Sequence, residues 1–170
     1  EDDRIRDADK ELLAQAQKSL EWAYNSLTDN GNSIPPKANR LNWLTSARHL
    51  LRHQKIASRI KSDTYKTVHA EHEEFWRHRF YIALDHEELL RPGYFSTSSE
   101  QTWPENIELS SALTIVKFSN WPKGQADPTD EVDCEAILRE ENALSGRAGR
   151  GLTSYNRVLA EAKERMNQPR

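Results

Sequence analysis

Cysteine and long apolar runs are nearly absent from this chain, and each absence excludes a class of protein. The 170 residues include one cysteine, Cys134, so neither an internal disulfide nor a cysteine-based zinc site can form. No apolar run approaches the roughly 20 residues that cross a bilayer, and the opening EDDRIRDADK does not resemble a signal peptide. We therefore expect a cytoplasmic protein with no membrane contact. The missing initial methionine leaves open that the chain is a fragment.

An excess of charge of one sign is also lacking. The 24 Lys and Arg residues and 27 Asp and Glu residues give a net charge of -3, so the chain has no overall basic signature for nucleic acid. Five Trp, five Tyr and four Phe residues argue against disorder. A chain of this length is most simply one domain.

Apolar residues recur with a helical period along most of the chain, which predicts an all-α fold. We expect a single-domain bundle of five or six helices over 1–170, with a three-helix part at 6–90 and a C-terminal helical part at 103–166. The stretch LTIVKF (113–118) is rich in β-branched residues and leaves open one short strand or hairpin. The helices are expected at 6–28, 38–61, 64–90, 103–120, 130–145 and 153–166.

Two predicted helices have the most regular apolar seams. The first has Leu13, Ala16, Leu20, Ala23 and Leu27 on one face. In the third helix Val68, Phe75, Ile82 and Leu89 recur every seven residues. Both seams are expected to lie in the core.

The segment EHEEFWRHRFYIALDH (71–86) is dense in charge, histidine and aromatic rings. Around it, His69 with His72 and Glu74 with His78 have spacings that place metal ligands on one helical face. Metal sites in bundles draw ligands from several helices, and the other predicted helices offer no inward Glu-x-x-His. We therefore expect no metal site and no cofactor, and interpret the segment as scaffold with its charges at the rim of the core.

A second interpretation of this segment is RNA cleavage. A histidine can move the 2′-hydroxyl proton, and an arginine can stabilise the charged phosphorane. The stretches Arg79-Phe-Tyr-Ile-Ala-Leu-Asp-His86 and Arg48-His-Leu-Leu-Arg-His53 resemble the Arg-x(4–6)-His motif of the HEPN family of helical domains. The resemblance implies a metal-independent RNase with Arg79 and His86 as its catalytic residues.

Residues 40–68 hold seven Lys or Arg residues and a single acid, Asp63. Four of the cations share one helical face, and we call them the basic stripe: Arg48, Arg52, Lys55 and Arg59. The stripe suits an acidic protein surface or a phosphate backbone. It can also pair internally with seven acids at 127–141: Asp127, Asp130, Glu131, Asp133, Glu135, Glu140 and Glu141.

The stretch SGRAGRG (145–151) is glycine-rich but lacks the Lys-Ser/Thr ending of a phosphate-binding P-loop, so we expect a flexible linker. Taken together, the sequence favours a non-enzymatic helical interaction module that binds another macromolecule, most directly a protein with an acidic surface. Accessory, regulatory, antitoxin and immunity roles fit equally. RNA, a homodimer and the RNase activity stay open as alternatives.

Overall fold

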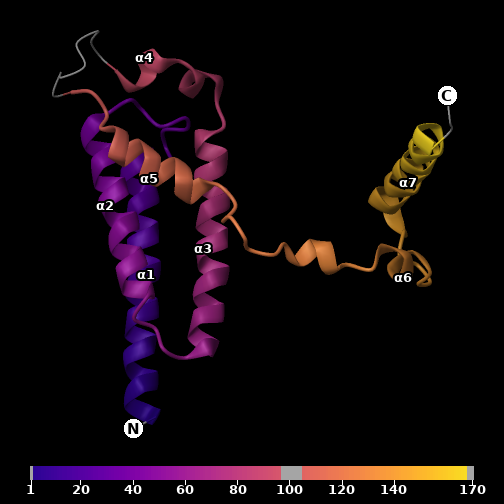
Figure 1. The fold of residues 1–170 in the computed structure, drawn as a ribbon, viewed down its shortest axis with the longest axis horizontal. Helices are drawn as coiled ribbons and strands as arrows, with labels where there is room; N and C mark the ends of the chain where they lie inside the picture. Colours follow the sequence, from indigo (N-terminus) through magenta and orange to yellow (C-terminus); the bar gives the residue numbers. More distant parts are fainter. Residues whose placement is uncertain (1, 97–104, 168–170) are drawn as a thin grey trace. The chain divides into compact units, whose positions relative to one another are not determined.

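The computed structural model describes residues 2–96 and 105–167. The chain divides into two compact units, Glu1–Lys123 and Gly124–Arg170, which are described separately. The first unit contains α1 (Asp2–Thr28), α2 (Arg40–Ala57), α3 (Asp63–Leu84), the 3-10 helix η1 (Glu87–Leu90), α4 (Pro92–Phe95) and α5 (Leu109–Ser119) (Figure 1). The second contains the 3-10 helix η2 (Pro128–Glu131), α6 (Cys134–Leu138) and α7 (Gly146–Asn167).

The all-α class is confirmed, because the described residues form helices, turns and loops but no strand. The alternative of a strand at 113–118 is wrong, since this stretch lies inside α5. Ala112, Ile115 and Phe118 are spaced by three residues and are all buried, so helical packing outweighs the β-branched composition. Residues 103 and 104 of the predicted helix 103–120 lie outside the described residues.

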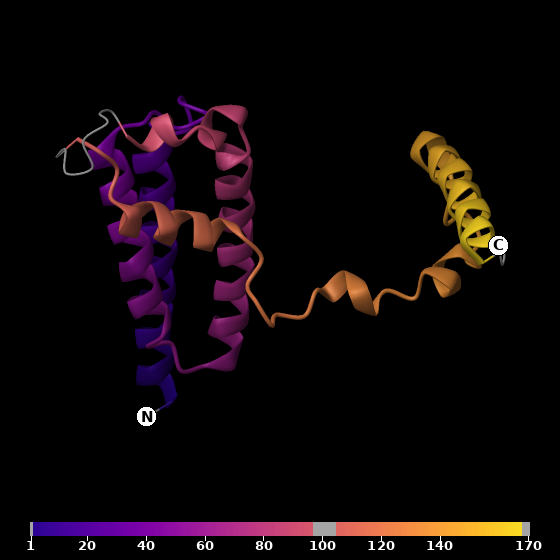
Figure 2. The same ribbon diagram turned by 45° about the horizontal axis from the view of Figure 1, so that its top comes forward.

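α5 completes the first unit. α1 packs against α2 and α3, and α5 crosses over the helices and packs against both α2 and α3 (Figures 1 and 2). From the sequence, residues 103–120 are predicted to belong to the C-terminal part instead. The contacts of α5 extend the first unit to Lys123. The expectation of one domain over 1–170 stays a prediction.

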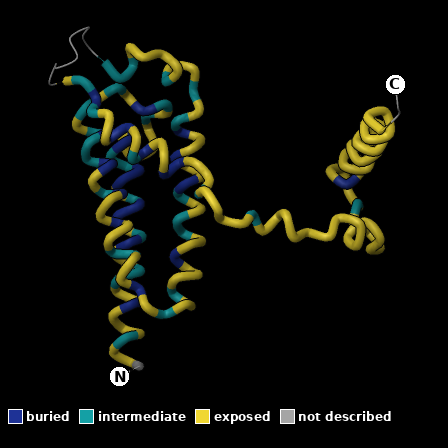
Figure 3. Tube along the Cα trace, viewed as in Figure 1, coloured by how far each residue is buried: buried dark blue, intermediate teal, exposed yellow. Residues whose placement is uncertain are grey.

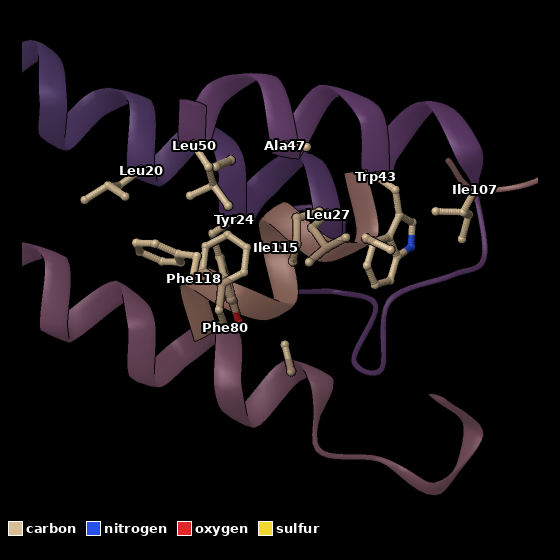
Figure 4. Close-up of a cluster of buried hydrophobic side chains, with 13 residues drawn as sticks. Leu20, Tyr24, Leu27, Trp43, Ala47, Leu50, Phe80, Ile107, Ile115 and Phe118 are labelled. Carbon is tan, nitrogen blue, oxygen red and sulfur yellow. The ribbon is translucent and has the colours of Figure 1, made fainter. Parts of the chain in front are cut away.

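The core lies where the four long helices of the first unit meet, and aromatic rings fill its centre. Phe80 of α3 makes edge-to-face contacts with Tyr24 of α1 and with Phe118 of α5, at centroid distances of 5.6 and 5.3 Å. Such pairs add stabilisation beyond the apolar area that they bury. Around them pack Leu20, Leu27, Trp43, Ala47, Leu50 and Ile115 (Figure 4).

The predicted apolar seam of Val68, Phe75, Ile82 and Leu89 is wrong at its first three positions. Val68, Phe75 and Ile82 are 38, 54 and 50 % exposed, so they face solvent and not the core. Leu89, which lies in η1, is partly buried and packs against the core. The buried positions of α3 are instead His69, Arg77, Phe80 and Ala83 (Figure 3). The hydropathy pattern misassigned this face because two of its buried residues are polar.

α3 is also shorter than predicted. It ends at Leu84, where Asp85 leaves the helical conformation with φ -82° and ψ 67°. The backbone N–H of His86 then donates to the carbonyl of Leu84, at 2.9 Å, and a 3-10 turn follows over Glu87–Leu90. The predicted end at residue 90 therefore included this separate turn.

Asp9 links α1 by hydrogen bonds to the connection between α2 and α3. Its buried carboxylate accepts the backbone N–H of Lys61, at 3.1 Å, and that of Ser62, at 2.7 Å. Hydrogen bonds to an ionised carboxylate are about twice as strong as those between neutral groups. The carboxylate therefore holds the start of α3 in place beside α1.

Removing this carboxylate should destabilise the folded chain. We expect Asp9→Ala to lower the free energy of unfolding by about 2–3 kcal/mol, because it leaves two backbone donors without their charged acceptor. Asp7→Ala, at an exposed position of the same helix, should change it by less than about 0.5 kcal/mol. Equal effects of the two substitutions in urea denaturation would contradict the anchoring role of Asp9.

The second unit corrects two expectations from the sequence. Only Cys134–Leu138 is α-helical within the predicted helix 130–145. The expected linker 145–151 is wrong as well, because Gly146–Gly151 forms the first turns of α7. A Cβ on the buried Gly149 would lie 2.0 Å from the carbonyl oxygen of Leu144. Glycine at this position therefore permits a close backbone approach.

Candidate functional site

All four cations of the basic stripe are exposed along the solvent side of the second helix. Arg48, Arg52 and Lys55 lie on α2, and Arg59 follows shortly after its end. At 100° per residue they fall opposite the buried side of α2. That buried side consists of Trp43, Ser46, Ala47, Leu50 and His53.

The stripe forms no ion pair within the described part of its own unit. Among the described residues up to Lys123, no carboxylate oxygen lies within 4.0 Å of a charged nitrogen of any of the four cations. By contrast, Arg40 at the start of the same helix forms an ion pair with Glu108. Among the described residues of this unit, then, none neutralises the four charges through an ion pair.

Aliphatic side chains accompany these cations. Leu41 is 61 % exposed on the same side of α2, and Leu51 is 47 % exposed at its edge. The only aromatic residue of α2, Trp43, is fully buried, and its indole Nε1 donates to the carbonyl of Lys37. The exposed side of α2 thus combines positive charge with aliphatic surface and offers no aromatic ring for stacking.

Arg79, predicted to be catalytic, lies against aromatic rings. Its guanidinium carbon is 4.9 Å from the centroid of Phe75, 5.8 Å from that of Trp76 and 5.9 Å from that of Tyr24. An arginine over aromatic rings gains cation–π attraction and covers apolar surface. The position of Arg79 is therefore explained by its packing over these partly exposed aromatic rings.

The second predicted catalytic residue, His86, lies beyond the end of α3. It is half-buried and lines a groove of about 390 Å³ together with Tyr81, Leu84 and Leu89. In the described part of the chain, no hydrogen bond or ring contact joins His86 to Arg79. In the other Arg-x-His stretch, Arg48 is exposed while His53 is buried.

A buried polar cluster joins α2 to α3. His53 Nε2 lies 2.8 Å from His69 Nε2, and the two rings are stacked with centroids 5.0 Å apart. His69 Nδ1 is 3.7 Å from Oε2 of Glu73, whose Oε1 accepts a hydrogen bond from Arg77 at 3.0 Å. The Arg77 guanidinium in turn lies 5.5 Å from the ring of Phe118 in α5. Four polar side chains thus form one continuous network beside the aromatic core.

Burial controls the charge of the two histidines. Burial, together with smaller contributions from the neighbouring His69 and Arg77, lowers the pKa of His53 to about 4, while a hydrogen bond to the backbone of Leu50 acts in the opposite direction. Burial also lowers the pKa of His69, with Glu73 acting in the opposite direction. Both imidazoles are therefore neutral at pH 7, and within the pair one ring nitrogen donates the shared proton while the other accepts it.

The network reaches the surface through a groove of about 630 Å³. Glu73 and Arg77 of α3 lie on one wall, and Gln54 of α2 and Lys117 of α5 are also part of the lining. Glu73 therefore belongs both to the buried network and to the groove.

Ligand spacing along a single helix does not indicate this cluster. The pairs that such spacing suggests are His69 with His72 and Glu74 with His78, but His72 contacts Gln17 of α1, while Glu74 and His78 are exposed. The signal was present in α2, because His53 continues the buried series at three residues after Leu50. A histidine on an apolar helical face marks a buried polar contact.

Comparison with protein-family models, curated proteins and solved structures found no match for this chain. Nothing therefore bears on the HEPN resemblance, which stays a prediction together with the RNase activity that it implies. Among the described helices, none is both long and apolar enough to cross a bilayer.

Proposed function

We propose that this chain is a helical interaction module that binds an acidic surface of another protein through the exposed side of α2. The supporting observation is the basic stripe, whose cations are exposed and have no ion-pair partner among the described residues of their unit. α2 has 18 residues. At 1.5 Å per residue it is about 27 Å long, which suits a helix that docks along its length.

A protein fits this surface better than RNA. Sites for single-stranded nucleic acid place aromatic rings between the cations so that bases can stack, and the one aromatic residue of α2 is buried. Exposed Leu41 and Leu51 add aliphatic area that a protein interface can bury. Complementary charge would speed the encounter and orient the partner. Accessory, regulatory, antitoxin and immunity roles all use such a surface, and a second copy of this chain is a further candidate partner.

Reversing two charges of the stripe tests the proposal. We expect the double variant Arg48→Glu, Arg52→Glu to keep its helix content and thermal stability but to lose its acidic partner. Arg59 stays unchanged because it lines a groove together with the buried Asp9. The measurement is affinity capture from a nuclease-treated lysate of the native host, with recovered proteins quantified by mass spectrometry.

A matched control carries Arg6→Glu and Lys10→Glu, which change the net charge equally at exposed positions of α1. It should recover the same partner as the unmodified chain. If the unmodified chain captures the partner from an untreated lysate but not from a nuclease-treated one, the result would favour RNA. If the stripe variant instead loses thermal stability and Glu140→Lys with Glu141→Lys restores it, the stripe pairs internally. Equal recovery by the stripe variant and the unmodified chain would contradict the proposal.

A further inference from the structure

Three side chains of the buried network carry potential metal ligands. His53 of α2 with His69 and Glu73 of α3 place one ligand atom each within 4.8 Å of one another. Two imidazole nitrogens and one carboxylate form a donor set that binds Zn²⁺ and other divalent first-row ions. We propose that His53, His69 and Glu73 bind one divalent transition-metal ion, for which Zn²⁺ is the reference ligand.

The closeness of the two rings supports this assignment. Two nitrogens bound to one tetrahedral Zn²⁺, each at 2.0–2.1 Å, are separated by about 3.3 Å. The His53 and His69 nitrogens are 2.8 Å apart and share one proton. An ion can replace that proton when the rings separate by about half an ångström, which side-chain rotations can supply.

The surroundings hold the carboxylate and leave access to solvent. Arg77 donates to Oε1 of Glu73 at 3.0 Å, and Oε2 lies 3.7 Å from His69 Nδ1, so a side-chain rotation of Glu73 must bring Oε2 to an ion held between the two Nε2 atoms. Such an outer contact orients a ligand, although the charge of Arg77 also weakens the attraction of Glu73 for a cation. Because Glu73 also lines the groove, water can complete the coordination of the ion. An open position of this kind is typical of catalytic metal sites.

A bound metal ion would cross-link α2 and α3, because its ligands come from both helices. Both helices pack against α1 and α5, and the His53–His69 pair bridges them. An ion that binds the folded chain but not the unfolded chain raises the apparent stability of the protein by mass action. This inference is independent of the proposed function, because the basic stripe lies on the opposite side of α2.

Metal titration of the full chain tests the inference. After treatment with EDTA, we expect one equivalent of Co²⁺ to produce the visible absorption of a low-symmetry site, and Zn²⁺ to displace it and raise the melting temperature. His53→Gln and Glu73→Gln should each weaken Zn²⁺ binding in calorimetry by more than about a hundred-fold, because losing a direct ligand costs more than the roughly ten- to hundred-fold loss caused by mutating an outer-shell partner. His78→Gln removes an exposed histidine of α3 and should leave the affinity unchanged.

Three results would overturn the inference: no stoichiometric binding by the unmodified chain, equal binding by His53→Gln, or loss of binding in His78→Gln. If the His53 or Glu73 variants fail to fold, X-ray absorption of the Zn²⁺-loaded unmodified chain decides. Scattering from two imidazole rings and a carboxylate oxygen supports the site, whereas one imidazole or none refutes it.

Discussion

Phe80→Ala is expected to lower the free energy of unfolding by about 3–5 kcal/mol, while Phe75→Ala, in the same helix, should cost less than about 1 kcal/mol. Phe80 is fully buried between Tyr24 and Phe118, so truncation leaves a cavity in the centre of the core. Phe75 is 54 % exposed and mainly supports the Arg79 guanidinium. Urea denaturation of the two variants measures the difference.

These variants form a matched pair, because each removes the same atoms from one helix. Ile82→Ala extends the comparison to another exposed member of the predicted seam, and it should also cost less than about 1 kcal/mol. If Phe75→Ala and Ile82→Ala proved as damaging as Phe80→Ala, the core of α3 would lie along the heptad seam and the described burial would be wrong.

The second large effect is a loss of stability at acidic pH. In metal-free buffer, His53 alone should remove about 3 kcal/mol from the free energy of unfolding between pH 6.5 and 4. Its pKa is about 4 in the folded chain, against 6.5 as the ordinary value. The unfolded chain therefore binds more protons in this window, so stability falls as pH falls. The charges that face His53 are those of Arg77 and, through His69, Glu73.

His53→Gln isolates this contribution. The variant should be less stable than the unmodified chain at pH 7, and its stability should decline less steeply between pH 6.5 and 4. Chemical denaturation at a series of pH values gives both curves. Parallel curves for the two proteins would show that His53 is protonated to the same extent in the folded and unfolded states, against the description of the buried pair.

Much of the fold could be predicted from periodicity. In α1, the predicted seam residues Ala16, Leu20 and Ala23 are fully buried, because one apolar face of this helix meets its neighbours. The same reasoning failed for α3, where His69 and Arg77 are buried while Phe75 is exposed. Hydropathy records the polarity of a side chain. It does not record whether a hydrogen-bond partner, such as Glu73 for Arg77, lowers the free-energy cost of burying that side chain.

The candidate sites were predictable to different degrees. The basic stripe follows from helical spacing alone, and the structure places its members on the exposed side of α2 as that spacing indicates. The His53–His69 contact depends on how α2 and α3 approach each other after the turn at Ser58–Ser62, which no local pattern specifies. Ligand spacing along a single helix cannot indicate two histidines that come from different helices.

The most direct test of the central claim, that the exposed cationic side of α2 recognises an acidic protein, is the association rate of the captured partner at increasing ionic strength. Stopped-flow fluorescence should show a fast rate for the unmodified chain that falls steeply with salt, because exposed charges steer the encounter. Arg48→Glu with Arg52→Glu should associate more slowly and show little salt dependence, while the Arg6→Glu, Lys10→Glu control should follow the unmodified chain. Identical rates and salt dependence for the stripe variant and the unmodified chain would contradict the claim.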